Sequence, residues 1–496
     1  MLYEDLFNQN SGAGAGSAMS AANVDELIKA ISATQQSGRT LDGTLTSGAA
    51  LKYESLEATL KNITFNNTHF TFYNNVIKKP ARSTVEEYNQ LVSYGRSGKY
   101  SVNEGELPES VDTQYRRLSE LIKYKGIVGQ VTDVILQTNN QIDVMAQEVQ
   151  SKMILLLQSV ENEMHFGDSN IDSLQFDGVF KLHKKANSDT NAEYFNSPFV
   201  YDARGSVLTD DIHNAVVSNV VNRGYGLVTD IFAPPKVFTD YVDQKYDTRR
   251  IVSGAEVQEG KFGQRVTSFV SQFGELMPRT TIFGRRSVER YTAGTTAAAQ
   301  ATKAPAAITP DGVSPLAAVA DTSATKFGTA YAGDYYVAVA AVNQYGEGPL
   351  TALSAAAVTV GATESIDMKF SITDNAYPAT GFVIYRSEKD PATALANTPL
   401  YPVFSISTTE LAAGYDGADA GLARDRNYDI PNTENAFLYE TRNPEIMAIK
   451  ELDKMKKLDL AITNPTYRFA ILYYLTMIMY APQKVGCIKN IGSLTD

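Results

Sequence analysis

The chain has 496 residues, of which 43% are hydrophobic and 20% charged, so it has enough length and apolar content for two to four folded domains. This composition excludes an intrinsically disordered protein. The formal net charge of -12 and the lack of a basic stripe exclude a protein that grips nucleic acid in the usual way. A single cysteine, Cys487, excludes an intrachain disulfide and a cysteine-based metal site, and favours a reducing compartment.

Neither a signal peptide nor a membrane span is predicted. The first residues lack a basic region followed by an apolar core. The most apolar run, residues 469–481, is shorter than the roughly 20 residues that cross a bilayer, so it is expected to be a buried element.

The first part of the chain is predicted to be an arm. Residues 9–23 are mostly Gly, Ala and Ser, and a short amphipathic helix is expected at 24–31. Before them stand four apolar side chains that should dock either on a neighbouring subunit or on the chain itself: Leu2, Tyr3, Leu6 and Phe7. A strand is expected at 70–76 and a short helix at 84–88.

A turn and two strands follow. An acidic Gly/Pro turn at Glu104–Pro108 precedes a strand at 111–117 and a second strand at 122–133, which contains Gly126 and Gly129. A long amphipathic helix is then predicted from Asn139 to His165. Its apolar face steps by three or four residues through Ile142, Met145, Val149, Met153, Leu156 and Val160.

A second group of elements has the order helix, strand, turn, helix. The helix is expected at 208–221 with an acidic first turn, the strand at 227–232, the turn at 233–236 and the last helix from 237.

These two groups, in this order, resemble the extended loop, spine helix and axial domain of tailed-phage major capsid proteins, which have the Hong Kong 97 fold. The resemblance implies an α+β fold with an N-terminal arm, an extended hairpin at about 78–125, a peripheral domain with the spine helix, and an axial domain. The expected divisions are 1–60 for the arm, 61–135 for the hairpin and flanking strands, 136–200 for the peripheral domain, 201–292 for the axial domain, 293–426 for an insertion and 427–496 for the return to the parent domains.

The insertion has a different sequence pattern. An Ala/Thr/Pro/Gly linker leads to strands at 335–343, 381–387 and 403–406. Two of these strands resemble strands of fibronectin type III domains, although in inverted order, which implies an all-β immunoglobulin-like sandwich. Its expected core is Tyr336, Val339, Phe382, Ile384 and Phe404.

No enzymatic constellation is present in the sequence, and no catalytic, cofactor-binding or metal site is predicted. The four histidines are scattered, and no nucleophile elbow, phosphate loop or His-Glu-x-x-His motif occurs. His165 is expected to act as a charged cap at a helix end. Calcium binding at Asp374–Asn375 or Asp416–Gly417 is a weaker alternative. Some capsid relatives form lysine–asparagine cross-links, for which Lys99 is a candidate, although an ordinary surface lysine is favoured.

The resemblance implies a structural protein that self-assembles into hexamers and pentamers of an icosahedral virion shell around double-stranded DNA. Its partners would be itself and portal, scaffolding or decoration proteins, with assembly in the host cytoplasm and no membrane contact. The alternative is a surface adhesin or carbohydrate-binding protein. The expected inter-subunit contacts are Leu2, Tyr3, Leu6, Phe7, Arg82, Glu86, Glu87, Glu104, Glu106, Arg116 and Arg117.

Overall fold

The computed structural model describes residues 64–494, and all of them belong to one compact unit, Ile63–Asp496. The gaps within this range are 96–100, 109, 139–142, 188–190, 247–265, 272, 294–302, 313, 323, 373–375, 414–420 and 462–463. The expected helix at 24–31, Lys99, both calcium candidates and the four apolar residues of the arm lie outside the described residues. The fold is α+β, as predicted.

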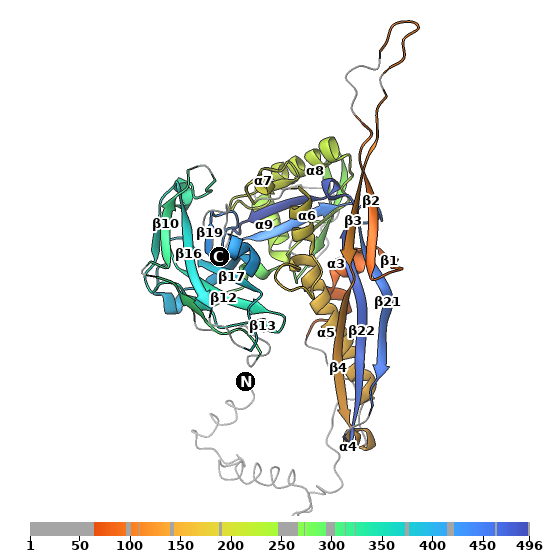
Figure 1. Ribbon diagram of the computed structural model, residues 1–496, viewed down its shortest axis with the longest axis vertical. Coiled ribbons are helices and arrows are strands. Elements are labelled where there is room, and N and C mark those ends of the chain that lie inside the picture. The colour runs from red at the N-terminus through yellow and green to blue at the C-terminus, as the bar shows by residue number, and fades with distance from the viewer. Residues whose placement is uncertain are drawn as a thin grey trace, which may run out of the picture. The chain divides into compact units, whose positions relative to one another are not determined.

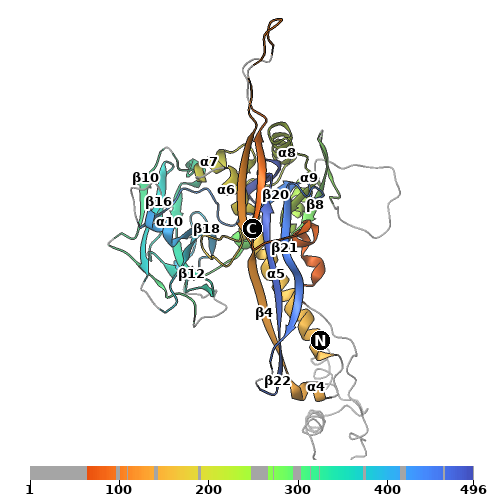
Figure 2. The same ribbon diagram turned by 45° about the vertical axis from the view of Figure 1, so that its right-hand side comes forward.

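A long helix packed on a four-stranded sheet forms the first layer pair. The sheet has the order β1 (Lys78–Pro80), β21 (Met447–Asp459), β22 (Thr466–Met479), β4 (Lys123–Thr132). Helix α5 (Val144–Phe166) lies along β4 and β22 in both views (Figures 1 and 2). It begins later than predicted because Asp143 caps it, accepting hydrogen bonds from the backbone N–H groups of Met145 (3.0 Å) and Ala146 (3.1 Å).

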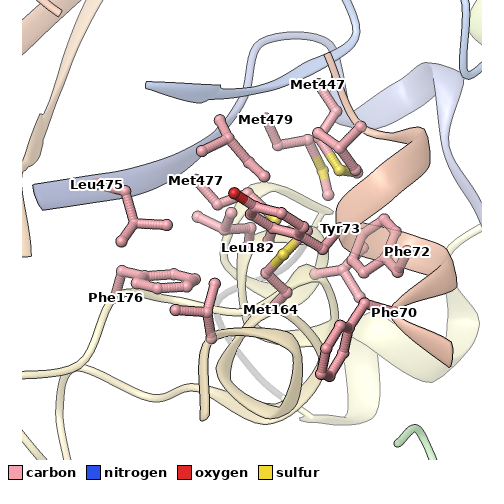
Figure 3. Close-up of a cluster of buried hydrophobic side chains, with 14 of the residues drawn as sticks. Phe70, Phe72, Tyr73, Met164, Phe176, Leu182, Met447, Leu475, Met477 and Met479 are labelled. Carbon is pink, nitrogen blue, oxygen red and sulfur yellow. The ribbon is translucent and has the colours of Figure 1, made fainter. Parts of the chain in front are cut away.

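The main core lies between this helix and the sheet. Every second residue of β22 from Phe469 to Met479 faces it, and Leu156 and Val160 on α5 meet them, as the predicted apolar face requires. Figure 3 shows aromatic side chains of α3 (Thr71–Asn75) and methionines of α5, β21 and β22 converging on one cluster. The strand expected at 70–76 is wrong: α3 lies there, directly after a 3-10 helix, η3 (Asn67–His69).

A second core lies between a six-stranded sheet and two helices. The sheet has the order β5 (Val200–Asp202), β23 (Gly486–Ile491), β20 (Glu434–Tyr439), β6 (Asp230–Ala233), β8 (Gly274–Thr280), β7 (Phe269–Ser271). The apolar residues of α8 (Asp210–Gly224) and α9 (Pro235–Tyr246) pack against it. The helix–strand–helix order expected from 208 onward is confirmed. The remaining helices of this part are α4 (Asp133–Gln137), α6 (Val179–Asn187), α7 (Asn191–Asn196), η4 (Arg286–Val288) and η7 (Pro482–Lys484).

Between Ile308 and Asp425 the chain forms two main antiparallel sheets with a shared apolar core. One contains β9 (Ile308–Pro310), β10 (Leu316–Ala320), β16 (Glu364–Ile372) and β19 (Leu422–Asp425). The other contains β12 (Val337–Asn343), β13 (Gly346–Glu347), β14 (Thr351–Ala352), β17 (Gly381–Ser387) and β18 (Leu400–Ser407). The smaller elements are β11 (Gly333–Tyr335), β15 (Val358–Val360), η5 (Thr329–Tyr331), η6 (Leu395–Asn397) and α10 (Thr408–Ala413).

Four of the five residues expected in this core belong to it. Val339, Phe382 and Ile384 are buried there and Phe404 is partly buried against them. Tyr336 is the exception: it lies between β11 and β12 and packs against a separate cluster. No helix in the described part of the chain has the length and apolarity needed to cross a membrane.

Candidate assembly surface

The hairpin of β2 (Val85–Ser93) and β3 (Gln114–Leu121) presents two different faces. Its inner face, on which Glu86, Tyr88 and Gln90 lie, contacts the same chain. Glu86 pairs with Lys450 (Oε2–Nζ 3.1 Å), the Tyr88 ring packs edge-on against Tyr480 at 5.1 Å, and the Gln90 amide donates to the Tyr480 carbonyl at 2.6 Å. The short helix expected at 84–88 is therefore wrong, because pairing with β3 and with these side chains requires a strand.

The outer face of the hairpin carries apolar side chains that are exposed. The register places Val85 opposite Leu121 and Leu91 opposite Tyr115, and these four side chains are 40%, 55%, 44% and 72% exposed, respectively. An ion pair between Glu87 and Arg117 (3.5 Å) lies between the two apolar pairs. Large exposed apolar groups in contiguous rows mark interaction surfaces.

The tip of the hairpin is acidic. Glu104 and Glu106 flank Gly105, whose φ of 88° belongs to the left-handed region that glycine adopts without strain. Leu107 beside them is 93% exposed. About half of the large apolar side chains that are exposed in the described chain lie between Val85 and Leu136, on the hairpin, β4 and α4.

A buried carboxylate fixes the position of the segment that precedes the hairpin. Glu161 on α5 accepts hydrogen bonds from the backbone N–H groups of Phe72 (3.0 Å) and Tyr73 (2.7 Å) in the first turn of α3. Burial raises the pKa of Glu161 to about 7, although the two hydrogen bonds act in the opposite direction. The Tyr73 hydroxyl also bonds to the Tyr473 hydroxyl (2.8 Å), and Tyr473 donates to Glu451. Segment 71–81 is thus fastened to both the helix and the sheet.

The buried histidines are structural. Burial lowers the pKa of His165 to about 3, and its Nε2 lies 3.1 Å from the Thr281 hydroxyl. The expected role of His165 as a charged helix cap is therefore wrong. Burial likewise lowers the pKa of His183 to about 4, and its ring bonds to the Tyr194 hydroxyl and the Val485 carbonyl. Among the described residues no group of three His, Cys, Asp or Glu side chains could hold a metal ion.

Arginine side chains join the two-sheet region to the rest of the chain. Arg204 donates to the carbonyls of Lys326 (2.6 Å) and Asn427 (2.8 Å). Arg386 is fully buried, bonds to Asp425 and to the Asn427 side chain (2.6 Å), and lies over two aromatic rings. Sequence reasoning missed this network. A signal for it was the arginine within the otherwise apolar run Gly381–Ser387.

The structure places the described members of the predicted contact set on one hairpin but gives them different surroundings. Glu86 has its partners in its own chain, which departs from the expectation that it pairs across subunits; its carboxylate also accepts the Arg82 backbone N–H at 2.7 Å. Glu87 and Arg117 pair with each other, Arg116 lies opposite Gln90 in the register, and Glu104 and Glu106 lie at the tip.

No family model matches the chain.

Two relatives align with nearly the whole chain. The major capsid protein of Staphylococcus phage K is 26% identical over 471 residues, and that of Staphylococcus phage S25-3 is 25% identical over 472 residues. In both cases the alignment covers 92% of this chain and 92% of the relative.

Two solved structures show weaker likeness. A chain of Mycobacterium phage Adephagia has a TM-score of 0.42 at 6% identity, covering 92% of this chain and 100% of that chain. The capsid of a native GTA particle has a TM-score of 0.40 at 9% identity, covering 91% and 99%. Scores this low add nothing to the sequence relationship.

The relatives are structural proteins, which confirms the expectation of a non-enzymatic role. Over about nine tenths of its length, this chain is similar to the major capsid proteins of bacteriophages.

Proposed function

We propose that this chain is the major capsid protein of a tailed bacteriophage and builds the shell by self-association. The observation that carries the proposal is the alignment with capsid proteins over 92% of both chains, which leaves no large part of either without a counterpart. A shell-forming role also fits the exposed apolar face of the hairpin.

The proposed architecture is of the Hong Kong 97 type. The β2–β3 hairpin would be the extended loop, α5 the spine helix of the peripheral domain (136–200), and the six-stranded sheet with α8 and α9 the core of the axial domain (201–292). The two-sheet region within 293–426 would be an immunoglobulin-like insertion that projects outward, and 427–496 would return to the parent domains.

The proposed assembly consists of hexamers and pentamers that enclose double-stranded DNA. The outer face of the hairpin would cover an adjacent subunit, because burying the exposed part of its four large apolar side chains would contribute up to about 1.5 kcal/mol each. The ion pairs near the tip would add at most about 1 kcal/mol each. The net charge of -12 would let packed DNA lie against the wall without sticking. Portal, scaffolding or decoration proteins would join the shell in the host cytoplasm.

Electron microscopy of the purified protein tests the proposal. Shells, tubes or six-fold rings are expected, and a monodisperse monomer at high concentration would contradict the proposal. The double variant Leu91→Asn, Tyr115→Asn should melt close to the unmodified subunit but fail to close shells, because both side chains are exposed in the subunit, by 44% and 72%. Val319→Asn is the matched control, since Val319 is similarly exposed on β10 (37%) and should not affect closure.

A further inference from the structure

The loop between helices α5 and α6, residues 167–178, is closed at its base. The N–H of Gly178 donates to the Gly167 carbonyl at 2.9 Å. A Cβ at Gly178 would lie 2.6 Å from the Glu163 carbonyl oxygen, so a glycine is needed where the loop returns to the end of α5. The fully buried side chain of Phe176 fixes the loop in the main core. Loops whose ends meet and whose own side chains pack against the protein form compact units.

Hydrogen bonds within the α5–α6 loop also hold its shape. Three aspartates of the loop accept backbone N–H groups of the same loop at 2.8–2.9 Å: Asp168, Asp172 and Asp177. Lys181 of α6 pairs with Asp168 at 2.9 Å. Bonds from an aspartate to the backbone stabilise turns, so the loop is a defined spacer and not a free connection.

One side of the α5–α6 loop faces the hairpin root, where β3 ends and β4 begins. The Lys123 ammonium group donates to the Ser173 carbonyl at 2.6 Å. Lys185 of α6 lies between Glu120 of β3 and Asp177 of the loop, with Nζ–O distances of 3.6 and 3.7 Å. The Lys185 side chain is 59% exposed, so each of its pairs contributes at most about 1 kcal/mol, and the Lys123 bond is the more direct link.

The other side of the α5–α6 loop lies on the two-sheet region. Gly381 is the first residue of β17, which pairs with β12 and with β18. A Cβ at Gly381 would lie 2.9 Å from the Cγ2 of Ile171, so the isoleucine side chain packs on the backbone of this strand. Ile171 and Ser173 are two residues apart, and one short segment therefore contacts both parts. Figures 1 and 2 show α6 between the two-sheet region and the hairpin.

We infer that the α5–α6 loop couples the two-sheet region to the hairpin root, so that a displacement of one changes the mobility of the other. Energetic coupling between two parts of a protein is carried by packed side chains and hydrogen bonds that continue from one part to the other. The contacts of Ile171 and Ser173 form such a connection. If the proposed function holds, a partner that fixes the two-sheet region would also restrict the hairpin.

Hydrogen exchange in unassembled subunits tests the inference from both ends. Ile171→Ala removes the contact with β17 and should speed exchange at the hairpin root, residues 118–125, severalfold. Lys123→Met removes the bond to the loop and should in turn speed exchange at residues 381–384, because coupling between two sites is reciprocal. Ile171 is changed instead of Gly381 because a Cβ at Gly381 would also lie 3.0 Å from the Ile406 carbonyl oxygen.

Two variants are matched controls. Leu174→Ala shortens a side chain of the same loop that is 55% exposed, and Lys454→Met removes an exposed charge from β21 of the same sheet. Both should leave exchange at the hairpin root and in β17 unchanged.

Three results would overturn the inference. They are unmodified exchange at the hairpin root in Ile171→Ala, unmodified exchange in β17 in Lys123→Met, and an equal acceleration throughout β22, which would report a loss of overall stability. The measurement needs no shells, so a failure of the proposed function would leave its outcome unaffected.

Discussion

At the scale of single residues, Glu161 links helix α5 to helix α3 in the main core. Its carboxylate is fully buried and accepts the N–H groups of Phe72 and Tyr73. Glu161→Ala should lower the free energy of unfolding by about 2–5 kcal/mol, because two buried donors lose their acceptor at about 1–3 kcal/mol each. Urea denaturation measures this loss. Glu148→Ala is the control, since Glu148 forms only a partly exposed pair with Lys152 on the same helix, and it should cost less than about 1 kcal/mol.

The same carboxyl should make stability depend on pH. Burial raises the pKa of Glu161 from 4.5 to about 7, so between these values the folded state binds more protons than the unfolded state. Its contribution is fully present below pH 4.5 and is lost as pH rises through about 7.

Glu161→Gln should remove this part of the pH dependence, so the difference in stability between the variant and the unmodified protein should change by a few kcal/mol across the window. Groups remote from Glu161 cancel in this difference, including Glu434, whose pKa burial also raises to about 7, and His183, whose lowered pKa acts in the opposite sense. The His165 ring lies 3.9 Å from the Glu161 carboxylate (Nε2–Oε1), but burial lowers its pKa to about 3, so in the folded protein it stays neutral across the window. A difference that stays constant from pH 4.5 to 7.5 would contradict the assignment.

Arg386 is a fully buried charge whose removal should be costly. Arg386→Met should destabilise the protein by about 3–5 kcal/mol, because Asp425 would remain buried without its cation. The double variant Arg386→Met, Asp425→Asn should recover part of this loss if the unpaired carboxylate causes it. Thermal unfolding of both variants decides, and an equally unstable double variant would point to lost packing on Phe327 and Tyr335 instead.

At the scale of elements, two glycines of β4 leave space in which side chains of β22 pack against the β4 backbone. A Cβ at Gly129 would lie 2.4 Å from the Phe469 ring. One at Gly126 would lie 2.9 Å from the end of the Leu472 side chain and 3.4 Å from the Ile471 carbonyl oxygen. Gly129→Ala should cost about 1–3 kcal/mol, since Phe469 is buried and its ring cannot move without disturbing the core. Gly126→Ala should cost less because Leu472 is partly exposed and flexible. Equal melting temperatures for the two variants would contradict this reasoning.

At the same scale, some elements were predictable from the sequence and others were not. The long helix α5 follows from a sustained apolar period, and β17 has the predicted bounds, because both patterns are local. The residues at 70–76 predicted a strand. Glu161, about ninety residues away, instead supplies acceptors that favour a helical turn with Phe70, Phe72 and Tyr73 all buried. The segment 84–88 has a helix-like composition, but pairing with β3 makes it a strand.

At the scale of the whole molecule, the junction of the two-sheet region changes how its removal should be designed. The sequence placed the insertion within residues 293–426, with linkers at its ends. Asp425 and Asn427 belong to the Arg386 network, and Arg204 bonds to Lys326.

Replacing residues 308–424 with a short Gly/Ser linker should still allow shells to form, if the proposed parent domains supply the lattice contacts. The subunit should melt at a lower temperature, because Arg204 and Asp425 lose partners within the removed part. Arg204→Ala in the full chain is the comparison and should reproduce part of that decrease. Loss of assembly together with normal melting would show that the region contributes lattice contacts itself.

The sequence by itself determined the α+β class, the long helix, the change of pattern near residue 300 and the relationship to capsid proteins. These depend on local periodicity, composition and the order of elements along the chain. Only the tertiary structure decided which hairpin face is bound within the chain and which carboxylates are buried. Glu86 and Glu87 are adjacent in sequence and both acidic, yet one pairs with Lys450 and the other with Arg117 on the exposed face. The reason is that strand pairing and burial are set by residues distant in sequence, whose contacts leave no local pattern.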